Sequence, residues 1–381
     1  MQTKHTILFI LLITLFSCKK EVKIVDPLNE ALASQSPKIK KVMDSLENYE
    51  VQIKFTQIDH QKEKVVFTDY DFQVNGHNYF YPASSVKFPI AVLTLEKLNS
   101  LADLDMNTVF YIEGDTLETT VAKEISKIFA VSDNEAYNRL FEFLGQDEIN
   151  QRLAEIEIKN TRISHRVSTP NADNITTKPI VIYVNDSTIR VTEKIINQPI
   201  KALDLNGSKK GNGYYEDDIL INKPFNFSLK NHYPIEAQQE VLKRIIFPEN
   251  YKPNEQFKIS EEQRAFILKA MHTLPKEVGY DANKYFDSYV KFFMYGDNHE
   301  SIPDNIEIYN KVGYAYGTLT DCAYIKDTKN DIEFLITATI LVNKNGIFND
   351  DTYEFDTVGI PFLAQLGREL YQQELQRKKN K

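Results

Sequence analysis

Ser84 and Lys87 stand three positions apart, with the spacing S-x-x-K. Pro82 precedes them, and apolar residues at helical spacing follow, which predicts a helix that begins here and runs to Leu98. Residues three positions apart share one face of a helix, so the two side chains should lie side by side. A serine becomes a good nucleophile when a base takes its proton, and a lysine shielded from water can be that base. The spacing therefore fits nucleophilic catalysis, although a helix cap followed by a solvated lysine gives the same pattern.

A second polar group is Ser132-Asp133-Asn134, at a break inside the helical region 121–144. A loop between helices can present polar side chains to a cleft. Ser or Asp before Glu135 is also a common way to begin a helix, and this capping interpretation is favoured when the group is taken alone.

A third group, Lys311-Val312-Gly313, opens a predicted strand. Gly313 has no side chain, so it lets the backbone approach a ligand closely. Taken alone, a lysine at the edge of a strand is usually a solvated charge.

Together and in this order, the three groups resemble the S-x-x-K, S-D-N and K-T-G motifs of the class A β-lactamases and penicillin-binding proteins. The likeness extends to Tyr79–Ala83, which lead into the serine, and to Asn310–Asp321, which resemble the third-motif strand and its turn. It covers most of residues 41–381, with the exception of about 171–235. The sequence is thus similar to the class A β-lactamase-like serine hydrolases.

The resemblance implies a role for each polar side chain. Ser84 would attack a lactam or amide carbonyl and form an acyl-enzyme, and Lys87 would help to deprotonate it. Ser132 would pass a proton to the leaving nitrogen, while Lys311 keeps the local potential positive. Asn134 would bind an amide of the substrate.

The resemblance also implies an oxyanion hole made by the backbone N–H groups of Ser84 and Tyr314, beside Gly313. Family members usually carry a hydroxyl residue where this chain has Val312, and that hydroxyl grips the substrate carboxylate. Without it a penicillin-like carboxylate should be held less well, and Thr318 is the candidate substitute.

The loop after the second motif departs from the family pattern. Class A enzymes carry a glutamate there that activates the deacylating water, and residues 161–173 contain none. Asp173 is the nearest carboxylate and the candidate deacylation base, with His165 as either another base or a packing residue. The atypical segment 171–235 follows, and it can rebuild the rim of the site for another substrate.

Three functions remain open. The first is a serine hydrolase that acts on a β-lactam or a related amide. The second is a peptidase or transpeptidase of the penicillin-binding-protein kind that acts on cell-wall peptides. The third is a lipoprotein that keeps the fold and binds a ligand without turning it over. The presence of all five polar motif residues argues against the third; they are Ser84, Lys87, Ser132, Asn134 and Lys311.

The elements that must position these residues follow from the hydrophobic patterning. Helices are predicted at 37–46, 84–98, 121–144, 147–156, 234–246, 260–273 and 359–375. Strands are predicted at 51–58, 64–70, 179–184, 188–191, 306–310, 322–325 and 332–342. This order indicates an α+β fold of two lobes. One antiparallel sheet is built from both chain ends and flanked by helices, and the helices of the middle form the other lobe.

The N-terminus has the features of an export signal. Lys4 precedes an apolar run over 7–16, and Cys18 follows where that run stops, as in the lipobox of bacterial lipoproteins. We expect residues 1–17 to be removed, Cys18 to carry lipid, 18–40 to be a tether and 41–381 to be the hydrolase domain. This predicts an exported bacterial lipoprotein, anchored at the periplasmic face or in the cell-envelope membrane. An ordinary cleaved signal with an incidental cysteine is the alternative.

Composition limits the remaining classes. Hydrophobic residues make up 42% of the 381, enough to bury a sizeable core. The formal charge is −9 and no basic stripe interrupts it, so nucleic acid is not an expected partner. The seven histidines are scattered, so no metal site and no cofactor are predicted. The other cysteine, Cys322, has no partner for an internal disulfide if Cys18 is lipidated, and a buried thiol is expected.

Overall fold

The structure is a computed structural model that describes residues 26–62, 64–101 and 103–380. The predicted signal segment and Cys18 lie outside the described residues. Among the described helices, none combines the length and the apolar character needed to cross a bilayer.

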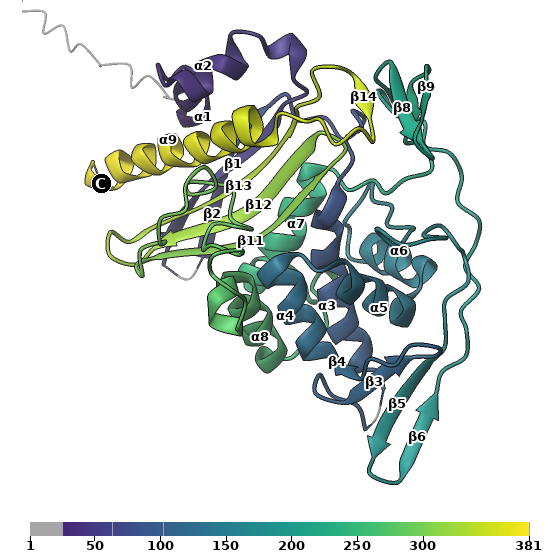
Figure 1. The fold of residues 1–381 in the computed structure, drawn as a ribbon. Coiled ribbons are helices and arrows are strands. Elements are labelled where there is room, and N and C mark those ends of the chain that lie inside the picture. Colours follow the sequence, from purple (N-terminus) through teal and green to yellow (C-terminus); the bar gives the residue numbers. More distant parts are fainter. Residues whose placement is uncertain (1–25, 63, 102, 381) are drawn as a thin grey trace, which may run out of the picture.

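A five-stranded antiparallel sheet, in the order β11-β12-β13-β1-β2, joins the two ends of the chain (Figure 1). Its strands are β1 Gln52–Gln61, β2 Lys64–Phe72, β11 Ile306–Ala315, β12 Thr318–Asp327 and β13 Ile332–Leu341. β1 pairs with β13, with Phe55 opposite Ile336, and this pairing links the early strands to the late ones. The mixed α+β fold with a sheet from both chain ends is thereby confirmed.

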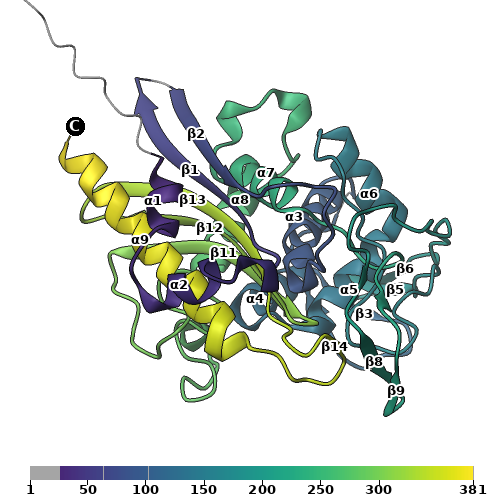
Figure 2. The same cartoon turned by 90° about the horizontal axis from the view of Figure 1, so that it is seen from above.

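Helices cover both faces of this sheet (Figures 1 and 2). On one face lie α1 Pro27–Leu32, α2 Pro37–Met43 and the long α9 Ile360–Lys379, and on the other lies α7 Ile235–Ile246. Strand β12 has both faces covered and is buried along nearly its whole length, including Cys322. Edge strand β2 alternates between exposed and half-buried residues, as expected for a strand with one solvated face.

The prediction of a tether over 18–40 is wrong for its second half, which folds into α1 and the start of α2. Asp26 caps α1 by accepting a hydrogen bond from the backbone N–H of Asn29 at 3.0 Å. Leu28 and Leu32 are buried in the core that α9 shares with the sheet. Helix α1 has only six residues, and its surroundings in the sequence are polar, so the sequence pattern did not reveal it. The folded domain therefore begins by residue 27.

The second lobe is helical. It contains α3 Lys87–Leu98, α4 Val121–Val131, α5 Asn134–Leu144, α6 Gln146–Glu155 and α8 Glu261–His272. Ten of the twelve residues of α3 are buried, because α4 and α5 pack against it. Shorter helical turns are η1 Leu46–Asn48, η2 Ala83–Val86, η3 Pro248–Asn250, η4 Pro253–Glu255, η5 Pro275–Val278 and the π-helical η6 Phe355–Gly359.

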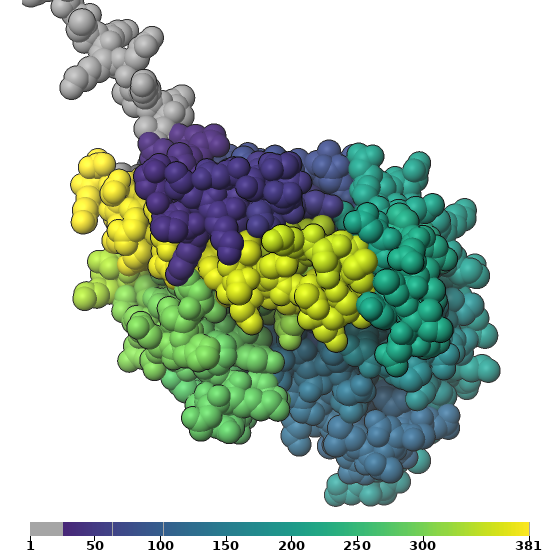
Figure 3. Space-filling model, turned by 45° about the horizontal axis from the view of Figure 1, so that its top comes forward, coloured from purple at the N-terminus to yellow at the C-terminus, as the bar shows by residue number. Residues whose placement is uncertain are grey.

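The segment 171–235 forms hairpins that attach to both lobes. The strands β5 Ile180–Asn185 and β6 Thr188–Val191 extend a small sheet with β3 Val109–Ile112 and β4 Thr119–Thr120. The later strands are β7 Lys209–Lys210, β8 Gly213–Glu216, β9 Ile219–Ile221 and β10 Phe225–Asn226. β8 pairs in parallel with β14 Ile347–Phe348, which places this segment beside the C-terminal chain in Figure 3.

Candidate active site

Ser84 lies in the 3₁₀ turn η2, directly before α3. Ala83 before it has a φ of 46°, in the left-handed region that L-residues seldom adopt. Lys87, three residues later, is the first residue of α3, so the two residues share one face of this helical segment. Of the two neighbouring serines, Ser84 lines a cavity, whereas Ser85 is buried and its hydroxyl donates to the carbonyl of Pro82 at 2.8 Å. The turn therefore places Ser84 at the cavity, and the hydrogen bond of Ser85 stabilises the turn.

Lys87 is fully buried beneath this cavity. Its Nζ donates to the carbonyl of Ser132 at 2.5 Å and to Oδ1 of Asn134 at 2.6 Å. Burial lowers the pKa of Lys87 to about 7, against the opposing effect of Asp133. An uncharged amine has two N–H groups and one lone pair, so these two bonds leave the lone pair free to take a proton.

The second motif contains both a helix cap and residues that line the cavity. Ser132 ends α4 with a φ of 59°, and this left-handed conformation turns the chain toward the cavity. Asp133 caps α5, because its carboxylate accepts from the N–H of Ala136 at 2.7 Å. Ser132 and Asn134 line the cavity on either side of that cap. The capping interpretation is therefore confirmed for Asp133, while the positions of Ser132 and Asn134 at the cavity are compatible with an active-site role.

Lys311 connects the third motif to the second. Its Nζ donates to Oγ of Ser132 at 2.8 Å and to the carbonyl of Val312 at 2.8 Å. Burial first, and then the neighbouring Lys87, hold the pKa of Lys311 well below its ordinary value. The positive potential expected from Lys311 is accordingly weakened, while its hydrogen bond leaves the hydroxyl proton of Ser132 free to be donated.

Gly313 allows β11 to approach the turn that carries Ser84. A methyl group at this position would lie 2.6 Å from the carbonyl oxygen of Pro82 and 2.9 Å from the backbone nitrogen of Ser84. The next residue, Tyr314, lines the cavity together with Ser84. This contact between strand and turn puts the two residues of the expected oxyanion hole on one wall.

Thr318 does not take the position expected of it. Tyr316 and Gly317 have φ values of 52° and 71° and form a two-residue hairpin turn, with Ala315 opposite Thr318. Thr318 is consequently buried at the start of β12 and is not among the residues that line the cavity. Val312 belongs to the hydrophobic core on the α9 side of the sheet, and part of it also borders the cavity.

The cavity has a volume of about 660 Å³ and largely aromatic walls. Its aromatic side chains are Tyr81, Tyr285, Tyr289, Tyr314, Tyr316, Tyr353 and Phe355. These rings therefore face the candidate site. No periodic pattern in the sequence marks this wall, because its residues come from four separate loops and strand ends.

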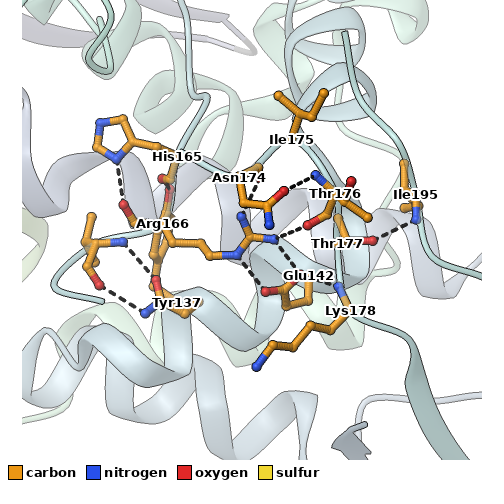
Figure 4. A network of polar contacts seen from close by, with 12 residues as sticks. Tyr137, Glu142, His165, Arg166, Asn174, Ile175, Thr176, Thr177, Lys178 and Ile195 are labelled. Atoms are coloured by element: carbon orange, nitrogen blue, oxygen red, sulfur yellow. Dashed lines mark hydrogen bonds and ion pairs between the residues drawn. The ribbon is translucent and has the colours of Figure 1, made fainter. Parts of the chain in front are cut away.

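The loop after α6 is fixed by a buried ion pair (Figure 4). Arg166 makes two hydrogen bonds to the carboxylate of Glu142, at 2.6 and 2.7 Å, and both side chains are buried. Arg166 also donates to the carbonyl of Asn174 at 2.8 Å, and the N–H of Lys178 donates to Glu142 at 2.8 Å. Because one ion pair holds both ends of the loop, the residues between them keep a defined position.

Known proteins resemble the chain in sequence and in fold. Residues 35–198 match the beta-lactamase enzyme family. No curated protein matches the chain. A beta lactamase from Xanthomonas campestris has a similar structure, with a TM-score of 0.50, 14% identity, and coverage of 90% of this chain and 97% of that one. The resemblance to the serine β-lactamase and penicillin-binding-protein superfamily is confirmed.

Two further solved structures align with the β-lactamase-like chain. A beta-lactamase from Sphaerobacter thermophilus has a TM-score of 0.49 and 12% identity, with coverage of 91% of this chain and 96% of that one. PBP-A has a TM-score of 0.48 and 13% identity, with coverage of 92% and 96%.

In the β-lactamase-like site, Ser168 is the residue of the loop 165–178 that contacts the second motif. Ser168, which lines the cavity, accepts a hydrogen bond from Nδ2 of Asn134 at 3.0 Å. Asp173 is exposed at the outer side of the loop and is not among the residues that line the cavity. The loop folds back after Ser168, since the N–H of Arg166 donates to the carbonyl of Ala172, and this turn carries Asp173 outward.

His165 is a packing residue in this arrangement. Its Nδ1 lies 2.6 Å from the carbonyl of Arg166, and its Nε2 accepts from the N–H of Asn231 at 3.2 Å. Burial lowers the pKa of His165 to about 4, so the ring is neutral, with both nitrogens engaged. Tyr81 stacks parallel to it, with ring centroids 6.3 Å apart.

The segment 171–235 supports the β-lactamase-like site from behind. Within the described part of the chain, none of its residues lines the cavity. Phe225 and Phe227 pack instead on Tyr316, with ring centroids 5.4 and 5.5 Å away, and Phe227 also contacts Tyr81. The segment therefore acts on the site through the aromatic rings of the cavity wall.

Proposed function

We propose that this protein is a serine hydrolase that forms an acyl-enzyme on Ser84 with a β-lactam or a related amide, and that releases it slowly. One observation carries the proposal. Ser84 and Ser132 line one cavity, and the buried side chains of Lys87 and Lys311 are both hydrogen-bonded to Ser132. This arrangement supports a serine nucleophile with a lysine base and a hydroxyl proton donor.

The acylation step follows from these contacts. Oγ of Ser84 attacks the carbonyl carbon while its proton passes to the lone pair of uncharged Lys87. The N–H groups of Ser84 and Tyr314 stabilise the negative charge on the carbonyl oxygen. When the C–N bond breaks, the leaving nitrogen takes the hydroxyl proton of Ser132, whose oxygen accepts a hydrogen bond from Lys311.

Slow release follows from the loop. Hydrolysis of the ester needs a base for the attacking water, and such a base is typically worth roughly 10²–10⁴ in rate. Ser168 occupies the contact with Asn134, and a serine hydroxyl cannot serve as that base. The ester on Ser84 is therefore expected to persist.

A fluorescent penicillin tests the nucleophile. We expect one label per molecule by intact mass, abolished by Ser84→Ala and retained by Ser85→Ala. The second variant is a matched control, because Ser85 differs only in pointing its hydroxyl into the turn. Labelling that survives Ser84→Ala would contradict the proposal.

A transpeptidase or peptidase acting on cell-wall peptides is a second candidate. The observation that favours it is again Ser168, since a long-lived ester can be attacked by an amine instead of water. The two functions differ in their products. If the acylated protein is mixed with a peptide amine, transfer yields a new amide, whereas hydrolysis yields only the free acid.

We also propose that the protein is exported and anchored through lipid on Cys18. The support is the sequence pattern around Cys18. Cys18→Ala should release the protein from membranes or block its processing, as judged by fractionation and by the mass of the N-terminal peptide. A soluble wild-type protein whose N-terminus lies elsewhere would contradict this.

A further inference from the structure

We infer that the cavity around Ser84 selects substrates that carry a positively charged amine, and this inference rests on the proposed function. The charged side chains that line the cavity are Asp133 and Asp351, and none of the described lysine, arginine or histidine side chains joins them. An anionic substrate group would meet acidic neighbours here, whereas a cationic group would meet opposite charge.

The two lysines near Ser84 do not reverse this balance. Nζ of Lys87 is engaged with Ser132 and Asn134, and Nζ of Lys311 with Ser132 and Val312. Both side chains are buried, and burial lowers the pKa of each, so that positive charge is disfavoured at both. Neither ammonium group is presented to a carboxylate in the cavity.

Asp351 is the acidic side chain available to a ligand. It is exposed, and no hydrogen bond to its carboxylate is found within the described residues. Its neighbour Asp350, by contrast, accepts from Nδ2 of Asn345 at 2.6 Å and from the N–H of Thr352 at 3.0 Å. Asp133 is already used in part, because it caps α5.

Aromatic rings line the same cavity as Asp351. Tyr353 and Phe355 follow Asp351 in the chain, with ring centroids 5.2 Å apart, and Phe355 packs edge-on against Tyr314 at 5.6 Å. Tyr285 and Tyr289 form a second pair at 4.9 Å. The faces of aromatic rings attract cations, most of all quaternary ammonium groups. An apolar neutral group would also fit such walls, so Asp351 should be the residue that makes the cavity prefer a cationic group over a neutral one.

Matched thioesters provide the test. We would use phenylacetyl thioesters with three thiol groups of similar size, which end in trimethylammonium, tert-butyl or carboxylate. Attack by Ser84 breaks the C–S bond, and the departing sulfur takes the proton of Ser132, so thiol release and the mass of the protein both report acylation. The corresponding amides, which react far more slowly, report binding alone by calorimetry.

The trimethylammonium compounds should exceed the tert-butyl compounds roughly three- to tenfold in acylation rate and in affinity. The carboxylate compounds should be the poorest. Asp351→Asn should lower the ratio of cationic to neutral compound toward one. Asp356→Asn is the matched control, because it removes an exposed charge from the same segment outside the cavity and should leave the ratio unchanged.

The outcomes separate this inference from the proposed function. Acylation of Ser84 by all three thioesters at equal rates, or fastest by the carboxylate, would overturn the charge preference and leave the function standing. A ratio that Asp351→Asn does not change would overturn the assignment to Asp351. If no thioester acylates Ser84, the proposed function fails, and the affinities of the three amides still decide the charge preference.

Discussion

Lys87 is the residue on which the proposed chemistry depends most directly. It must be uncharged to accept the proton of Ser84, and burial lowers its pKa to about 7. Asp133 favours the charged form and opposes the effect of burial on this pKa. A lysine with its ordinary pKa of 10.5 would be almost wholly protonated at neutral pH.

The first prediction follows from that pKa. The acylation rate should rise as the pH increases through about 7 and should level off above it, because only the unprotonated amine accepts a proton. The rate of labelling by a fluorescent penicillin, measured from about pH 5 to about pH 9, gives the profile. Lys87→Ala should lower the rate by roughly 10²–10⁴. A wild-type rate independent of pH over this range would exclude Lys87 as the base.

Ser168 is the residue that should limit turnover. Ser168→Glu would place a carboxylate beside Asn134, where it can accept a proton from water, so the acyl-enzyme should decay at least about tenfold faster. Ser168→Gln is the control, since it has the same length and no basic group. The decay of the acyl-enzyme mass with time measures both. Equal acceleration by the two variants would show that space for water, rather than a base, had been limiting.

At the scale of elements, the loop 165–178 is held by the ion pair of Arg166 with Glu142. Both side chains are buried, so removing one partner leaves an uncompensated charge. Arg166→Ala should lower the free energy of unfolding by about 3–5 kcal/mol, measured by urea denaturation. Lys159→Ala breaks the exposed pair with Glu157 and should cause no measurable change. A small effect of Arg166→Ala would mean that the backbone hydrogen bonds alone fix the loop.

The elements also show what local sequence could and could not reveal. The long helices and the sheet built from both chain ends were predictable, because apolar residues recur at helical spacing in α4 and α7 and form nearly continuous runs in β13. Helix α1 was missed, because six residues carry too little periodicity and the helix is stabilised by α9 from the far end of the chain.

For the site, the three motifs identified the side chains that the structure brings together at Ser84. Their spacing could not reveal Tyr285, Tyr289 or Tyr353, because these lie in irregular loops whose approach to Ser84 depends on the assembled fold. It also could not place Thr318, whose burial follows from the tight turn before it. Chemistry that depends on a short motif was therefore predictable, and the substrate-facing wall was not.

At the scale of the whole molecule, a distant segment supports the active-site wall through Phe227. This buried ring lies outside the cavity and packs on Tyr316 at 5.5 Å, on Tyr81 at 5.9 Å and on Phe348 at 5.3 Å. It thereby joins the segment 171–235 to the hairpin turn of the sheet and to the chain before Ser84. Replacing it should affect stability and acylation together.

Phe227→Ala should lower the free energy of unfolding by about 3–5 kcal/mol, because it leaves a cavity among rings that cannot fully close it. It should also slow labelling of Ser84 in the fraction that remains folded, since Tyr81 and Tyr316 lose the ring that positions them. Denaturation and labelling measured on the same sample separate the two effects. Leu229→Ala, at an exposed site of the same segment, is the control and should change neither. A folded Phe227→Ala variant that labels at the wild-type rate would show that the segment stabilises the fold without shaping the site.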